Sequence, residues 1–272
     1  MSIKLVFGGT KEIVSNIDEL IKAAFESTFA TDSAMSKKER QTYHYYIRIM
    51  VELGWPAYND ADFDFHKQIV DLVEAEQYEK IEDAIYDHYD AVYIQELQEI
   101  LEDAPLINSG RLPILKEAFL LYNLGYYYGS VALLISQIGG IAKDIERELL
   151  NNGVCFDPDN EKLLESRYRV TRTSEKGKVI MALLENYKYN DEEKENLYSI
   201  GYFRSIVFND QLKGEDLLHH TSRHMLLHGE QLTFGSKEQA LKLILCVDIL
   251  YNAAYVLYNE LIIPSACMEC QT

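Results

Sequence analysis

Residues 126–150 read YYYGSVALLISQIGGIAKDIERELL, a strongly apolar stretch near the middle of a 272-residue chain. Its large aliphatic residues recur at the three- and four-residue spacing of a helix, which predicts a buried helix over this range. Glycine inside a helix is unfavourable by about 1 kcal/mol relative to alanine. Gly129, Gly139 and Gly140 therefore indicate close approach by a neighbouring helix, or a kink at Gly139-Gly140.

The same helical spacing recurs through the rest of the chain, interrupted by loops. We expect helices over the ranges 11–30, 36–53, 61–77, 78–102, 111–124, 179–187, 192–208, 215–228 and 236–261. Ser36 and Ser236 each begin a capping box, which predicts a helix start at both positions. No two segments have the alternating pattern of paired strands. The sequence thus predicts an all-α helical bundle.

The loop over 104–110 is the best candidate for a boundary, because it contains Pro105 and Asn108-Ser109-Gly110. It divides the chain into an acidic N-terminal helical region, 1–105, and a C-terminal helical domain, 106–272. Residues 71–103 hold twelve acidic side chains and a single lysine, Lys80. Such a run is typical of a solvated helix face, and the alternative is a docking surface for a basic partner or a mimic of nucleic acid.

The composition limits the classes of function. The net charge is −18 and the pI is about 4.8. An acidic surface repels nucleic acid at long range, so any role in nucleic-acid binding needs a local basic patch. The only basic cluster lies in a loop-rich insertion over 152–177. We find no signal peptide, membrane span or disulfide framework, and therefore expect a cytoplasmic protein without membrane contact.

The segment TSRHMLLHGE, residues 221–230, is the best candidate for a functional site in the chain. Four of the seven histidines fall between residues 219 and 228. A histidine exchanges protons at neutral pH because its ordinary pKa is about 6.5. An arginine stays charged, and its planar guanidinium fits phosphate oxygens. Arg223 and His228 together suffice for metal-free cleavage of RNA, in which imidazole moves a proton and guanidinium stabilises the transition state.

The pattern Arg223-His224-x-x-x-His228, followed by Gly229 and a long terminal helix, resembles the motif of the HEPN superfamily (higher eukaryotes and prokaryotes nucleotide-binding). That motif is an arginine, a polar residue, three variable residues and a histidine. The polar position is often asparagine and here is His224. The resemblance covers about residues 106–262. It implies a helical homodimer that acts as a metal-independent endoribonuclease in a bacterial toxin or phage-defence system, with no metal or other cofactor.

The resemblance also implies roles for single residues. His228 would be the general acid or base, Arg223 would bind phosphate, and His224 would orient or assist. The polar residues expected to line the cleft are Gln137, Asp144 and Glu146. Contacts with the RNA backbone are expected from three arginines of the insertion: Arg167, Arg169 and Arg172. A regulatory protein is a further candidate partner.

Two other interpretations stay open at this point. His220, His224 and His228 recur at four-residue spacing on one helical face, and two histidines so placed can share a metal ion. Alternatively, the histidines are structural, and the protein is a non-catalytic interaction protein such as an antitoxin or a regulatory dimer. His219 and His220 can also precede the helix, with Ser222 as its N-cap.

Overall fold

The computed structural model describes residues 37–56, 63–152, 207 and 216–258. Helices make up 79% of this part, which contains no strand, and the predicted all-α fold is thereby confirmed. The helices predicted over 11–30 and 179–187 lie outside the described residues, as does nearly all of the one over 192–208. Among the described helices, none is long and apolar enough to cross a membrane.

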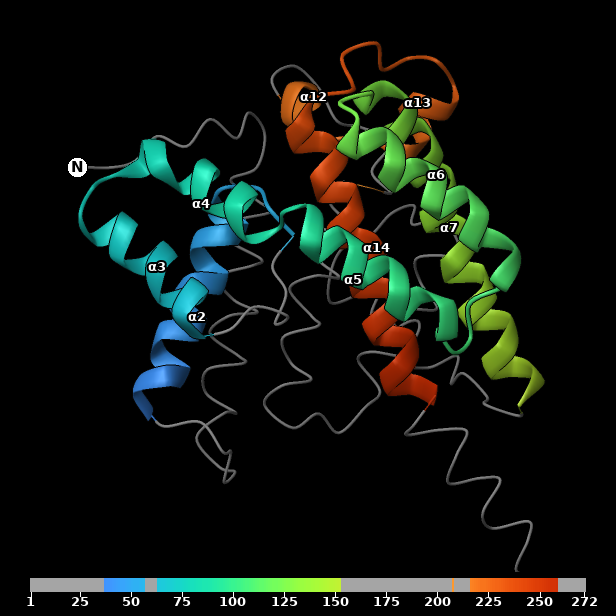
Figure 1. Ribbon diagram of the computed structural model, residues 1–272, viewed down its shortest axis with the longest axis horizontal. Coiled ribbons are helices and arrows are strands. Elements are labelled where there is room, and N and C mark those ends of the chain that lie inside the picture. The colour runs from blue at the N-terminus through green and yellow to red at the C-terminus, as the bar shows by residue number, and fades with distance from the viewer. Residues whose placement is uncertain (1–36, 57–62, 153–206, 208–215, 259–272) are drawn as a thin grey trace, which may run out of the picture.

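The described part of the N-terminal region forms four α-helices and two short 3-10 helices (Figure 1): α2 (Lys37–Glu52), α3 (Phe63–Glu74), η2 (Tyr78–Lys80), α4 (Ile81–His88), α5 (Ala91–Ile100) and η3 (Leu101–Asp103). The single helix predicted over 78–102 is wrong, because Asp90 interrupts it. The Asp90 carboxylate accepts hydrogen bonds from the backbone N–H groups of Val92 (2.8 Å) and Tyr93 (3.0 Å). It thereby caps α5 as a new helix.

A helical hairpin follows. The 3-10 helix η4 (Ser109–Arg111) leads into α6 (Leu112–Asn123), and α7 (Tyr127–Asn151) returns beside it. Gly125 joins the two helices with a φ of 79°, a conformation that glycine adopts without strain. Both helices match the predicted ranges 111–124 and 126–150. α7 continues as one helix through Gly139-Gly140.

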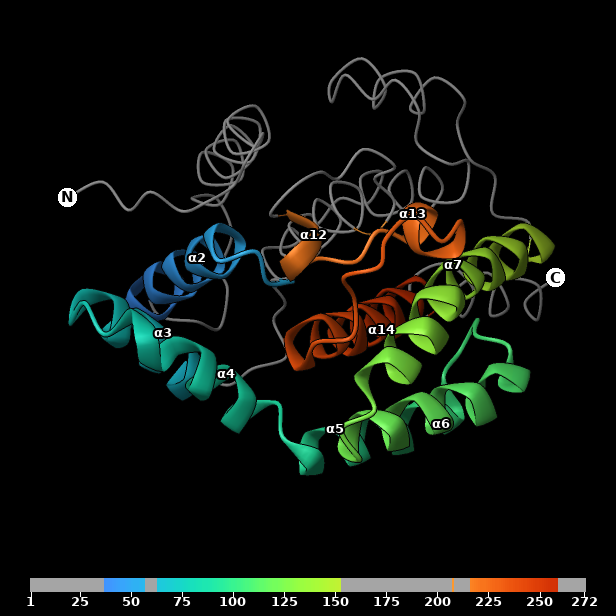
Figure 2. The same cartoon turned by 90° about the horizontal axis from the view of Figure 1, so that it is seen from above.

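The helix α14 (Lys237–Leu257) lies in the middle of the described structure. In Figure 2 it runs between α2–α4 on one side and the α6–α7 hairpin on the other. Every residue from 239 to 250 is buried, as expected of a helix enclosed on all sides. Its N-terminus has the predicted capping box, in which Ser236 and Gln239 satisfy each other's backbone N–H groups.

Contacts cross the boundary that the sequence suggests at residue 105. The Tyr93 hydroxyl on α5 donates to the Asp248 carboxylate on α14. The Lys242 ammonium of α14 lies 4.9 Å from the centroid of the Trp55 ring. Buried residues from both sides belong to one hydrophobic cluster. The division into 1–105 and 106–272 stays a prediction, and α14 links the described parts of both.

Candidate functional site

The motif segment folds as two short helices, α12 (Asp216–His219) and α13 (Arg223–Leu227), so the single helix predicted over 215–228 is wrong. The alternative with Ser222 as N-cap is confirmed, because its hydroxyl accepts a hydrogen bond from the Met225 N–H at 3.3 Å. Between the two helices, residues 220–222 are buried.

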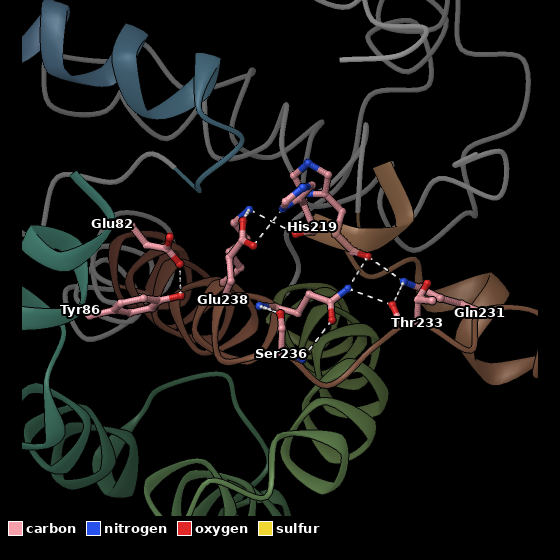
Figure 3. A network of polar contacts seen from close by, with 10 residues as sticks. Glu82, Tyr86, His219, Gln231, Thr233, Ser236 and Glu238 are labelled. Atoms are coloured by element: carbon pink, nitrogen blue, oxygen red, sulfur yellow. Dashed lines mark hydrogen bonds and ion pairs between the residues drawn. The ribbon is translucent and has the colours of Figure 1, made fainter. Parts of the chain in front are cut away.

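Two buried glutamines hold this break in place (Figure 3). The Gln231 side chain donates to the His220 carbonyl at 2.7 Å and accepts from the Ser222 N–H at 3.0 Å. The Gln239 side chain donates to the same carbonyl at 3.1 Å, and both amides also donate to the Thr233 carbonyl. The backbone groups left open by the break thus find partners inside the protein, which offsets the cost of burying them.

Glu238 and Lys242 on α14 also hold α12 in place through His219. Glu238 accepts from the Lys242 ammonium at 2.6 Å, and its second oxygen lies 3.1 Å from Nδ1 of His219 (Figure 3). Lys242 is almost fully buried and also donates to the His219 carbonyl at 3.2 Å. Burial lowers the pKa of Lys242, and the adjacent Glu238 carboxylate opposes that shift.

His220 does not share a face with the other two histidines of the motif. It precedes α13 and is 3% exposed, whereas His224 and His228 are both exposed. Burial, with the positive charge of Lys242 and the nearby His219, lowers the pKa of His220 to about 2, so its ring is neutral at physiological pH. The one-face arrangement of three histidines is therefore wrong. Within the described ranges, no three His, Cys, Asp or Glu side chains are placed to hold a metal ion.

His224 and His228 form an exposed imidazole pair at the end of α13. Their ring centroids are 4.4 Å apart and the rings are tilted by 51°. The helix ends at Leu227, the chain turns at Gly229, whose φ is 73°, and the Glu230 N–H donates to the Met225 carbonyl at 2.8 Å. This is the Schellman arrangement of a helix C-terminus. It fixes the backbone that carries the two rings and leaves both side chains in solvent.

Arg223 lies against the backbone of α7. A Cβ atom built on Gly139 would be 2.7 Å from Nε and 3.2 Å from Cζ of Arg223. The sequence predicted close approach by a neighbouring helix, or a kink at Gly139-Gly140. At these two glycines the structure instead has arginine side chains against α7, which continues as one helix. Nε of Arg223 is buried, and no group in the described structure accepts its hydrogen. The residue as a whole is partly exposed.

Arg111 lies against the next glycine, Gly140, where a Cβ atom would overlap its guanidinium. It donates from Nε to Oδ2 of Asp144 at 2.6 Å and from Nη2 to Oδ1 at 3.2 Å, and Nη1 donates to Gln137 at 2.9 Å. The Asn108 N–H and the Arg147 guanidinium also donate to Asp144. Burial raises the pKa of Asp144, but these hydrogen bonds and the two positive charges outweigh it and hold the pKa below its ordinary value.

Five of the predicted site residues lie within the described residues, on or next to two helices that pack together. Arg223 and His224 come from α13, and His228 is its C-cap. α13 packs on α7, which carries Gln137 and Asp144. The predicted RNA-binding residues Arg167, Arg169 and Arg172 lie outside the described residues, as does the side chain of Glu146. Sequence reasoning did not single out Arg111 or Arg147. The paired glycines were the one signal that pointed toward the Arg111 contact.

Comparisons with protein-family models, with curated proteins and with solved structures give no significant match.

Proposed function

We propose that the protein is a metal-independent endoribonuclease of the HEPN type, acting in a bacterial toxin or phage-defence system. The observation that carries this proposal is the arrangement along α13 and its C-cap, where an arginine packed against α7 is followed by two exposed imidazoles. Arg223 adjoins α7 at Gly139, and His224 and His228 lie together in solvent. A guanidinium and two groups able to exchange protons are what metal-free phosphodiester cleavage requires.

The proposed reaction is an intramolecular transfer within the RNA. One imidazole, His228, takes the proton from a 2′-hydroxyl, and the 2′-oxygen forms a bond to the adjacent phosphorus. The bond from phosphorus to the 5′-oxygen breaks, and that oxygen receives a proton from a second imidazole. Arg223 stabilises the additional negative charge on the phosphoryl oxygens. The products are a 2′,3′-cyclic phosphate and a 5′-hydroxyl.

The second imidazole is His224 of the same chain or a histidine of a second copy. A homodimer would join two such motifs into one symmetric cleft. The insertion with Arg167, Arg169 and Arg172 would bind the RNA backbone, although the protein as a whole is acidic.

The test is cleavage of a mixed RNA pool in EDTA by the wild type and three variants. We expect His228→Ala and Arg223→Ala each to lower the cleavage rate by roughly 100-fold or more. His219→Ala is the matched control, because His219 is also an exposed histidine but lies on α12. It should cleave at the wild-type rate.

Two results would count against the proposal. Cleavage that EDTA abolishes would contradict the metal-free mechanism. Absence of cleavage by a folded wild-type dimer would favour a non-catalytic interaction protein, in which the ion pairs of Asp144 with Arg111 and Arg147 serve only the fold.

A further inference from the structure

We infer that Gly139 is a positioning residue for Arg223, a role that rests on the proposed phosphate-binding function of that arginine. Because Gly139 has no side chain, the Arg223 guanidinium packs directly against the α7 backbone at this position. We call this position on α7 the Arg223 seat. Gly139 itself contacts no substrate. It acts by fixing where the arginine presents its charge.

The geometry of the seat involves the body of the guanidinium. A Cβ atom on Gly139 would lie 2.7 Å from Nε, 3.2 Å from Cζ and 3.4 Å from Cδ of Arg223. These are three consecutive atoms of the side chain, so rotating its far end does not remove the overlap. Alanine at position 139 thus requires the Arg223 side chain to shift away from its present contact with α7. Glycine is otherwise a poor choice inside a helix, and this contact gives a physical reason for it.

The seat also determines which atoms of Arg223 can meet a ligand. Nε is buried and has no acceptor in the described structure, so it is closed to a bound phosphate. Neither Nη atom is among the buried atoms that lack a partner, and the residue keeps exposed surface. A phosphate at this surface therefore meets the two Nη groups. Arg223 lies on the same short helix as His224, and His228 is the C-cap of that helix.

The neighbouring glycine provides a matched comparison. A Cβ atom on Gly140 would meet the Arg111 guanidinium in the same way, but Arg111 donates hydrogen bonds to Asp144 and Gln137. We assign Gly140 a structural role for that reason. Gly129 is a second comparison on the same helix, because a Cβ there would meet only a methyl group of Leu121, at 2.9 Å. That contact is with the end of a flexible side chain.

The first readout of the test is independent of activity. It is the Nε–H signal of Arg223 in ¹⁵N-labelled protein, assigned by its disappearance in Arg223→Lys. A buried Nε–H exchanges slowly with water, so we expect a protected signal in the wild type and in Gly129→Ala. In Gly139→Ala the signal should move to the position and fast exchange of a solvent-exposed arginine. An unchanged, protected signal in Gly139→Ala, or an unprotected one in the wild type, would overturn the proposed seat.

The second readout is RNA cleavage in a double-mutant cycle. Gly139→Ala should lower the cleavage rate by roughly 10- to 100-fold, because a displacement of about 1 Å in a positioned group has effects of that size. In an Arg223→Ala background the same substitution should change the rate by less than about twofold, since there is no arginine left to position. Equal losses in both backgrounds would contradict a role through Arg223.

The two readouts separate this inference from the function on which it rests. If the wild type shows the protected signal but cleaves no RNA, the seat stands and the proposed function fails. If the wild type cleaves RNA and Arg223→Ala does not, while Gly139→Ala leaves both signal and rate unchanged, the function stands and the positioning role fails.

Discussion

Two buried aspartates have pKa values that are shifted in opposite directions. Asp144 is bonded to two arginines and a backbone N–H, and its pKa lies below the ordinary value despite its burial. Asp248 on α14 is as deeply buried, but its partners are the Tyr93 hydroxyl and the Asn252 amide, which carry no charge. Burial raises the pKa of Asp248 to about 6, and the two hydrogen bonds only partly oppose the shift.

The raised pKa of Asp248 gives a stability prediction with a definite sign. The folded pKa is above the unfolded value, so the protonated carboxyl stabilises the fold at low pH. That contribution is complete below pH 4 and is lost as the pH rises through about 6. Asp248→Asn keeps a neutral side chain at every pH. We expect it to raise the free energy of unfolding at pH 8 by about 1 to 3 kcal/mol relative to the wild type.

Urea unfolding of both proteins at pH 4.5, 6 and 8 measures this effect. The advantage of Asp248→Asn should be smallest at pH 4.5, where the carboxyl of the folded wild type is protonated. A difference between the two proteins that is the same at all three values would show that the Asp248 charge does not carry the effect.

At the scale of single elements, α13 depends on its two ends. A helix this short does not hold itself together in water, so its caps and its packing on α7 maintain it. Ser222 satisfies the N-terminal backbone, and Gly229 turns the chain at the C-terminus. His228 is the residue between the last helical position and that turn. The position of the imidazole pair is therefore set by the caps.

Removing the N-cap should affect both stability and cleavage. Ser222→Ala leaves the Met225 N–H without its acceptor and should lower the free energy of unfolding by about 1 kcal/mol. Ser236→Ala, at the N-cap of α14, is the control and should have a similar effect on stability. Only Ser222→Ala should slow RNA cleavage, measured on the same pool. Equal cleavage rates in the two variants would mean that the α13 cap does not position the site.

How far the elements could be predicted depended on what terminates them. Ser236 opens α14 through a local capping box that is legible in the sequence. Asp90 separates two helices, but the apolar residues keep their helical spacing across it. The spacing alone therefore predicts one helix where there are two. The break before α13 is fixed by Gln231 and Gln239, which act from 9 to 19 residues away. Local patterns do not encode such contacts.

The same limit applies to the candidate site at the scale of the molecule. The residues of one local motif, Arg223, His224 and His228, could be named from their spacing. The pairing of Arg111 with Asp144 spans 33 residues and joins two helical segments, so no spacing rule reveals it. The paired glycines predicted a close approach to α7. Only the fold identifies the arginines that make it.

For the whole molecule, α14 makes the two predicted regions depend on each other. A chain that begins at residue 106 lacks Trp55, whose ring contacts the Lys242 ammonium, and Tyr93, whose hydroxyl donates to Asp248. The buried side chains of Lys242 and Asp248 are then left with fewer partners. We expect the fragment 106–272 to melt on the order of 10 °C below the full chain, or without a cooperative transition. Thermal unfolding followed by circular dichroism measures this. A cooperative melt at the full-length temperature would instead establish 106–272 as an independent domain.

The most direct measurement of the central claim identifies the ends of RNA fragments produced by the full chain in EDTA. The imidazole–guanidinium mechanism predicts fragments with a 2′,3′-cyclic phosphate at one end and a 5′-hydroxyl at the other. Fragments with a 3′-hydroxyl and a 5′-phosphate would contradict it, because those ends require attack by water and not by the 2′-oxygen.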